Sequence, residues 1–246
     1  LSAKDSINLF LENEDEMAKA NYLDNNYWLT AEKIINDHWS FSSTLFLQTS
    51  DSNRTGVLSD NEIQGDLMEK RQSEFKGLKT QFNYQHNAKL AMSFGLLLQH
   101  ESTDIHYQKD TFGSDFISQI LNPNTVNRSV SHVFKNKGKR QAYYGNIRYQ
   151  FSPKLFGDLG LRYDAQDWIN KVQKSPRLNL SYFYSDSLTF RIGSGRHYQE
   201  QSIDSVLLED EELAYFEPEA ADIAVFEIQK RLNAKYALRA ELYYKK

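Results

Sequence analysis

The sequence predicts an all-β protein, namely an antiparallel up-and-down segment of a transmembrane β-barrel with about eleven long strands. Three observations predict it. Apolar residues recur at every second position, and the alternating runs are long. The connections between the runs alternate between very short and long. The composition agrees, because 15 Tyr, 15 Phe and 3 Trp accompany only 4 Pro and 11 Gly in 246 residues.

Composition also excludes several classes of function. The formal net charge of −4 gives no sign of a nucleic-acid partner. The absence of cysteine excludes disulfide frameworks, thiolate zinc sites and cysteine nucleophiles. The most apolar stretch, Leu90 to Leu98, is far shorter than the roughly 20 apolar residues that a spanning helix needs.

In the N-terminal half, four segments read as strands. The best defined is 90–98, where apolar residues from Leu90 to Leu98 oppose Ala91, Ser93 and Gly95. The other three are 25–36, 39–50 and 73–86.

In the C-terminal half, the clearest strand is 154–168, with leucine and tyrosine on one face and charged residues on the other. The remaining predicted strands are 143–151, 177–184, 188–192 with an extension to 199, 221–231 and 235–244. Each of these segments has one apolar face and one polar face.

The connections between the strands fall into two groups. Tight turns are predicted at Asp37-His38, Asn87-Ala88, Ser152-Pro153, Ser185-Asp186 and Asn233-Ala234. Long links are predicted at 51–72, 108–139 and 199–220, with a shorter one at 167–174. A compact soluble domain rarely has several loops above about 12 to 15 residues. An outer-membrane barrel has short turns on one side and long loops on the other.

A soluble β-sandwich or solenoid would also alternate apolar and polar residues. The strand lengths favour the barrel, because several runs reach twelve or more residues, whereas ordinary strands average about 5 to 6. Aromatic residues near the strand ends, such as Trp39, Tyr84 and Trp168, would suit the girdles at the two membrane interfaces.

The wet faces carry many charges and predict a wide, polar lumen, because a small barrel has a dry interior. The candidate lumen-facing residues are Asp158, Arg162, Asp164, Arg177, Asn179, Arg191, Glu227, Arg239 and Glu241.

From Ser175 onward, the chain resembles the barrel domain of TonB-dependent outer-membrane receptors. The resemblance is carried by four motifs: Ser175 to Tyr182, "SPR-x-x-x-x-Y"; Leu188 to Gln199, "R-x-G-x-G-R-x-Y"; Glu217 to Ala221, "PE-x-A"; and Leu238 to Lys245, "L-x-x-E-x-Y-Y-K". Residues 22–168 resemble the family mainly in their succession of strand pairs joined by short turns.

This resemblance implies a location and partners. The tight turns would face the periplasm and the long loops the outside of a Gram-negative outer membrane, in a barrel of 22 strands filled by an N-terminal plug. The plug would couple to the TonB complex and would contact the lumen residues. The ligand would be a small molecule or metal chelate: a siderophore, cobalamin, haem or an oligosaccharide. We expect residues 1–246 to be a central part of such a barrel, without the plug and the last strands.

A calcium loop is a second candidate site. The segment from Asp51 to Glu62 has oxygen ligands at alternate positions, glycine at the sixth position and glutamate at the twelfth. Its candidate ligands are Asp51, Asn53, Thr55, Val57, Ser59 and Glu62. A solvated turn explains the same residues, and no other cofactor is predicted.

Two further charged clusters belong to the predicted outer loops. The acidic link 199–222 and the adjoining Tyr198 offer Tyr198, Glu209, Asp210, Glu211 and Glu212 as apical ligand contacts. The acidic link would attract cationic ligands or calcium, or is merely a solvated loop. The basic patch Lys135, Lys137, Lys139 and Arg140 would suit lipopolysaccharide phosphates at the outer rim, or serve solubility alone.

We predict no enzyme, because no Ser, His and acid are recognisably arranged for nucleophilic catalysis. Three alternatives to a receptor stay open: a passive porin-like or adhesin-like barrel without a plug, an outer-membrane barrel enzyme such as a lipase or protease, and a soluble β-rich binding module.

Overall fold

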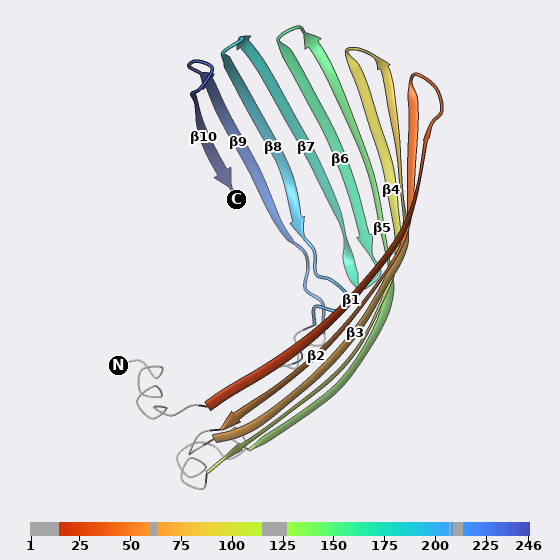
Figure 1. The fold of residues 1–246 in the computed structure, drawn as a ribbon, viewed down its shortest axis with the longest axis vertical. Coiled ribbons are helices and arrows are strands. Elements are labelled where there is room, and N and C mark those ends of the chain that lie inside the picture. The colour runs from red at the N-terminus through yellow and green to blue at the C-terminus, as the bar shows by residue number, and fades with distance from the viewer. Residues whose placement is uncertain (1–14, 60–62, 115–126, 207, 209–213) are drawn as a thin grey trace.

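The computed structural model describes residues 15–59, 63–114, 127–206, 208 and 214–246. They form one antiparallel sheet of ten strands in which each strand pairs with its neighbours in sequence. The strands are β1 (Asp15–Ile34), β2 (Trp39–Ser59), β3 (Ile63–Asn87), β4 (Leu90–Gly113), β5 (Arg128–Ser152), β6 (Leu155–Gln166), β7 (Ile169–Ser185), β8 (Leu188–Gln199), β9 (Glu219–Arg231) and β10 (Ala237–Lys245). Figure 1 shows this sheet curling around a hollow side.

The predicted up-and-down all-β fold is confirmed, as are the five tight turns, which all lie at one end of the sheet. The described residues form ten strands where about eleven were expected, and residues assigned to long links lengthen these strands. Thus β2 and β3 contain 21 and 25 residues and fill most of the predicted link 51–72. Likewise the link 167–174 is a tight turn followed directly by β7. No described segment is a helix long and apolar enough to cross a membrane.

The outward face carries an apolar band near the tight turns. Leu159 and Leu161 of β6 are 59% and 57% exposed there, and the register partners of Leu159, Ile147 and Leu178, are also apolar. On β2 the band runs from Trp39 to Leu47, about 27 Å along the strand. This length matches the apolar band of an outer-membrane barrel, about 25 Å tall.

Beyond Leu47 the outward face of β2 becomes polar, with Thr49, Asp51 and Asn53 in succession. The strands nevertheless continue, and their register is unbroken to Ser59. The N-terminal strands therefore extend well past the apolar band, on the side opposite the tight turns.

A small core lies on the inward face. It is formed where the described residues of the connection between β8 and β9 (200–206, 208 and 214–218), here called the strap, fold against the sheet (Figure 1). Ile203, Val206 and Leu208 of the strap are 0%, 2% and 3% exposed. Val206 and Leu208 cluster with buried residues of β4 and β5, namely Ile105, Tyr107 and Val130.

Candidate functional site

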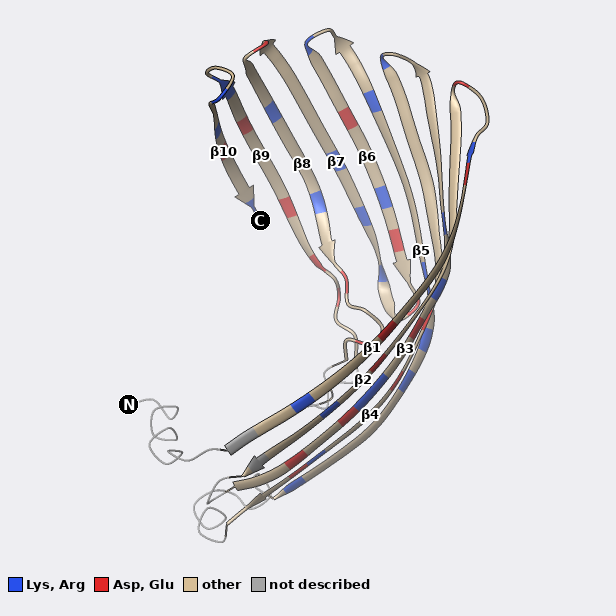
Figure 2. Cartoon of the chain, in the orientation of Figure 1, with Lys and Arg blue, Asp and Glu red and all other residues tan. Residues whose placement is uncertain are grey.

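Nine residues predicted to line a lumen share one face of the sheet. Directly paired residues on neighbouring strands point to the same side. The register joins Asp158 to Asn179, and Arg191 to both Ser181 and Glu227. Continued across the strands, the same pairing also aligns Arg162, Asp164, Arg177, Arg239 and Glu241. The strap packs against this face, so all nine side chains are inward. Figure 2 marks the charged residues of β6 to β10 as blue and red bands along the strands.

Most of these charges are paired with one another. Arg148 Nε lies 2.7 Å from Asp158, and the guanidinium of Arg162 binds both oxygens of Asp164 at 2.7 Å. Further along, Glu227 accepts from Arg191 and from Arg239, the latter at 2.9 Å, and Arg239 also contacts Glu241. Arg148 was not among the predicted lumen residues, although it stands on the polar face of β5.

Polar contacts anchor the strap to the inward face. Arg140 donates to the carboxylate of Glu200, and Gln166 donates to the same carboxylate at 3.1 Å. Ser73 donates to Asp204 at 3.3 Å, and the indole N–H of Trp168 donates to the Gln201 carbonyl at 3.2 Å. These contacts bring β3, β5, β6 and the β6–β7 turn to one segment of the chain.

Glu101 is the most perturbed carboxyl group beneath the strap. It is 2% exposed, and its Oε1 receives no hydrogen bond from any described residue. Burial raises the pKa of Glu101 to about 7; Arg140 opposes this rise, and Asp204 and Glu200 add to it. Burial also raises the pKa of Glu200. Glu101 lies three residues past Leu98, where the continuous outward apolar run of β4 that begins at Leu90 ends, and so is outside the apolar band.

This carboxyl group makes strap docking dependent on pH. With the strap docked the pKa is about 7, whereas an exposed glutamate has 4.5. Docking is therefore favoured fully below pH 4.5, and this contribution is lost as the pH rises toward 7. We expect amide hydrogens of the strap, corrected for intrinsic rates, to exchange faster at pH 8 than at pH 5.5. Glu101→Gln should remove most of this difference and the outward Glu74→Gln none; an unchanged difference in Glu101→Gln would refute the assignment.

Except for Arg140 of the basic patch, the other predicted site residues are not on this face or cannot be placed. Tyr198 pairs with Ala220 at the end of β8 and is outward, in phase with Ile192. Glu209, Asp210, Glu211 and Glu212 lie outside the described residues. In the basic patch, Arg140 is inward and bound to Glu200, because neighbouring residues of a strand point to opposite faces, so only Lys135, Lys137 and Lys139 are outward.

The calcium-loop interpretation of Asp51 to Glu62 needs a correction. Residues from Asp51 to Ser59 are strand, hydrogen-bonded to β1 and β3. At about 3.3 Å per residue, Asp51 and Ser59 are about 26 Å apart, so these oxygens cannot surround one ion. Val57 and its alternate neighbours Asn53 and Thr55 lie along the outward face, and Glu62 is outside the described residues.

A hollow of about 450 Å³ opens on the inward face between β3 and β7. Its lining includes Lys79, Tyr144, Arg162 and Arg177. Arg162 is paired with Asp164, whereas neither Lys79 nor Arg177 has a carboxylate partner among the described residues. The hollow therefore presents two uncompensated cations.

Comparison with known families decides where this architecture belongs. The model of the family described as "TonB dependent receptor-like, beta-barrel" matches residues 5–215. The chain belongs to this family. The match covers the hairpins of the N-terminal half and the two motifs from Ser175 to Gln199, but ends before the motifs at Glu217 and Leu238.

Solved structures agree with this TonB-dependent receptor fold. The siderophore receptor PiuA from Acinetobacter baumannii has a TM-score of 0.63 at 10% identity, over 91% of this chain and 40% of that one. The ferric yersiniabactin uptake receptor FyuA from Yersinia pestis gives 0.58 at 14%, over 94% and 36%. The RagAB peptide importer in its open-open state gives 0.60 at 11%, over 96% and 30%. No curated protein sequence matches.

This TonB-dependent receptor chain thus spans 30 to 40% of the length of these three structures. At such low identity the likeness concerns the fold alone. The barrel-wall geometry of the ten strands is shared, while the ligands named for those proteins are theirs.

Proposed function

We propose that this chain is part of the barrel wall of an active outer-membrane importer for a scarce, bulky, negatively charged ligand, such as a ferric siderophore. The other candidate ligands, cobalamin, haem and oligosaccharides, would suit an inward hollow with less positive charge than this one. Family membership supports the transport role. The observation that carries the ligand's charge is the inward hollow with the uncompensated Lys79 and Arg177.

Three partners follow from this proposal. The ligand would be captured above the membrane and would pass the inward cations Lys79 and Arg177. The TonB complex of the inner membrane would supply energy through a plug that contacts residues such as Arg191 and Glu227. Lipid and lipopolysaccharide of a Gram-negative outer membrane would surround the outward band.

An uptake assay tests this proposal. Cells that express the receptor containing this chain are given radiolabelled ferric siderophores, cobalamin, haem, peptides and oligosaccharides. We expect accumulation of an anionic ferric chelate. The double variant Lys79→Gln/Arg177→Gln should lower its uptake at least tenfold, because a hydrogen bond to a charged group contributes about 1.5 to 3 kcal/mol.

The matched control is Lys19→Gln/Lys70→Gln, which removes two outward lysines far from the hollow. It should transport normally. Preferential uptake of a neutral oligosaccharide, unaffected by either double variant, would contradict the assignment of the ligand's charge.

A further inference from the structure

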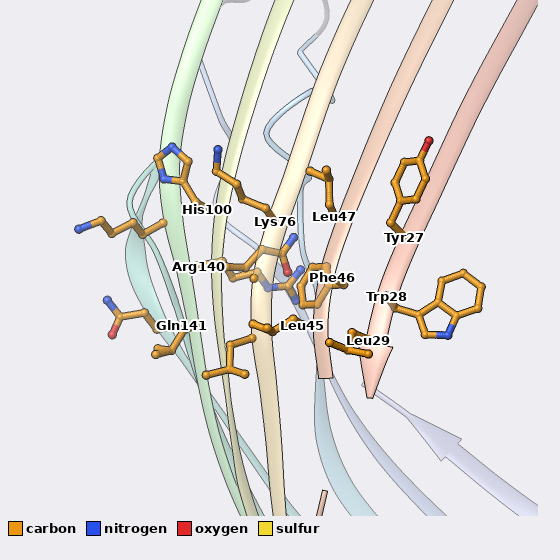
Figure 3. A pocket seen from close by; sticks show the side chains of 15 residues that line it. Tyr27, Trp28, Leu29, Leu45, Phe46, Leu47, Lys76, His100, Arg140 and Gln141 are labelled. Carbon is orange, nitrogen blue, oxygen red and sulfur yellow. The ribbon is translucent and has the colours of Figure 1, made fainter. Parts of the chain in front are cut away.

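Arg140 stands on the inward face of β5 at the level where the outward apolar band ends. Its outward neighbour Gln141 pairs with Leu98, the end of the continuous apolar run of β4. Figure 3 shows Arg140 between His100 above it and Gln141 below it in this view. Tyr144, which lines the inward hollow, is four residues and about 13 Å nearer to the tight turns. An anion that enters from the side opposite the tight turns therefore meets Arg140 before it reaches the hollow.

The ion-pair partner of Arg140 belongs to the strap and not to the sheet. Among the described residues, Arg140 forms an ion pair only with Glu200. Arg162, whose charge also interacts with that of Glu200, is paired with Asp164 of its own strand at 2.7 Å. Once the strap undocks, Arg140 therefore becomes a cation without a carboxylate partner on the sheet.

The site around Arg140 offers more hydrogen-bond donors than Glu200 uses. Oε2 of Glu200 accepts from Arg140 Nη2 and, at 3.1 Å, from the side-chain amide of Gln166, which is 6% exposed. Arg140 Nε is also buried and has no acceptor among the described residues. Nε and Nη2 form one edge of the guanidinium, and such an edge can bind both oxygens of a carboxylate. A ligand carboxylate can therefore form three hydrogen bonds where Glu200 forms two.

The sheet has a seat that brings Glu200 to this site. The indole N–H of Trp168 donates to the carbonyl of Gln201, the residue after Glu200, at 3.2 Å. Trp168 lies against Gly138 of β5, where an added Cβ would be only 2.7 Å from the indole ring. Residues 200–218 contain no lysine or arginine, so the strap brings only negative charge to the wall.

We propose that Arg140 and Gln166 form a binding site for an anionic oxygen group of the transported ligand, and that the docked strap fills this site with the carboxylate of Glu200. The strap and the ligand then compete for one cation. The apparent affinity for the ligand is lowered by the fraction of receptor in which the strap is docked. A ligand carboxylate that uses both Nε and Nη2 displaces the strap, whereas a neutral molecule leaves it docked. This inference rests on the anionic ligand of the proposed function.

Binding of citrate to the purified receptor containing this chain tests the proposal. Citrate is the tricarboxylate probe and sucrose the neutral one, at one pH and constant ionic strength. Citrate affinity is measured by equilibrium dialysis, and release of the strap is measured as faster amide hydrogen exchange at residues 200–206. We expect saturating citrate to accelerate this exchange at least tenfold and sucrose to leave it unchanged.

Three variants assign the effect to the proposed site. Glu200→Gln removes the competing charge and should raise citrate affinity at least tenfold. Arg140→Gln should bind citrate at least tenfold more weakly than Glu200→Gln does. The control Glu217→Gln removes another carboxylate of the strap, which is 74% exposed and paired with Lys171, and should change citrate affinity less than threefold.

The inference fails if citrate does not bind to Glu200→Gln, if Glu200→Gln and Glu217→Gln bind it equally, or if saturating citrate leaves strap exchange unchanged. Equal citrate affinity in Arg140→Gln and Glu200→Gln would place the anion elsewhere and would overturn the inference as well. Uptake of a neutral ligand contradicts the proposed function, whereas competition between citrate and the strap is measured without transport. Normal uptake of an anionic ferric chelate with equal citrate affinity in all three variants refutes the Arg140 site alone.

Discussion

Leu161→Arg is expected to destabilise the folded receptor by about 2 to 4 kcal/mol and to remove most of it from the outer membrane. Leu161 is outward and 57% exposed, in the middle of the apolar band. An arginine on the lipid-facing side near the bilayer midplane carries this cost because its charge loses hydration. The measurement is the free energy of unfolding in urea in lipid vesicles, with the amount of folded receptor in outer-membrane fractions.

Asn146→Arg is the matched control. Asn146 lies one strand away at nearly the same level and points inward, where it faces polar and charged neighbours. An arginine there remains hydrated, so its cost should stay below about 1 kcal/mol. If Asn146→Arg cost as much as Leu161→Arg, the assignment of the two faces would be wrong.

Ile203→Asp is expected to release the strap from the inward face. Ile203 is 0% exposed, and its carbonyl accepts a hydrogen bond from Tyr215 at 2.5 Å. Burying a carboxylate in place of this side chain costs several kcal/mol unless the segment undocks. The fraction of docked strap should therefore fall by at least a hundredfold, seen as faster hydrogen exchange at residues 200–206.

Phe216→Asp provides the corresponding control on the same segment. Its side chain is 51% exposed, so an apolar residue is again replaced by an acid, but without burial. The rate of amide hydrogen exchange in the strap should change less than threefold. Equal exchange in both variants would mean that the buried contacts of Ile203 do not hold the strap.

The faces of β6 could be predicted from the sequence alone. Lipid and water impose opposite preferences on the two sides, so Leu159 and Leu161 alternate clearly with Asp158 and Arg162. The same contrast is missing in Asp51 to Ser59, where both faces are mainly polar. Alternation then carries no signal, and hydrogen-bonded strands beyond the apolar band resemble a loop in the sequence.

Contacts between distant parts of the chain could not be predicted from the sequence. Lys139 and Arg140 look like one basic patch, yet they point to opposite faces because a strand alternates. Glu101 carries no motif, and its raised pKa arises from burial near Glu200 and Asp204, about a hundred residues away. Only the fold of the strap reveals this site.

The most direct test of the importer proposal is whether uptake needs energy. Accumulation of the anionic ferric chelate is measured in cells that express the receptor containing this chain, with an energised inner membrane and after an uncoupler or inactivation of TonB. An importer accumulates the chelate above its external concentration only in the energised, TonB-active cells. Equilibration at the same rate in all three would contradict the account and would indicate a passive pore.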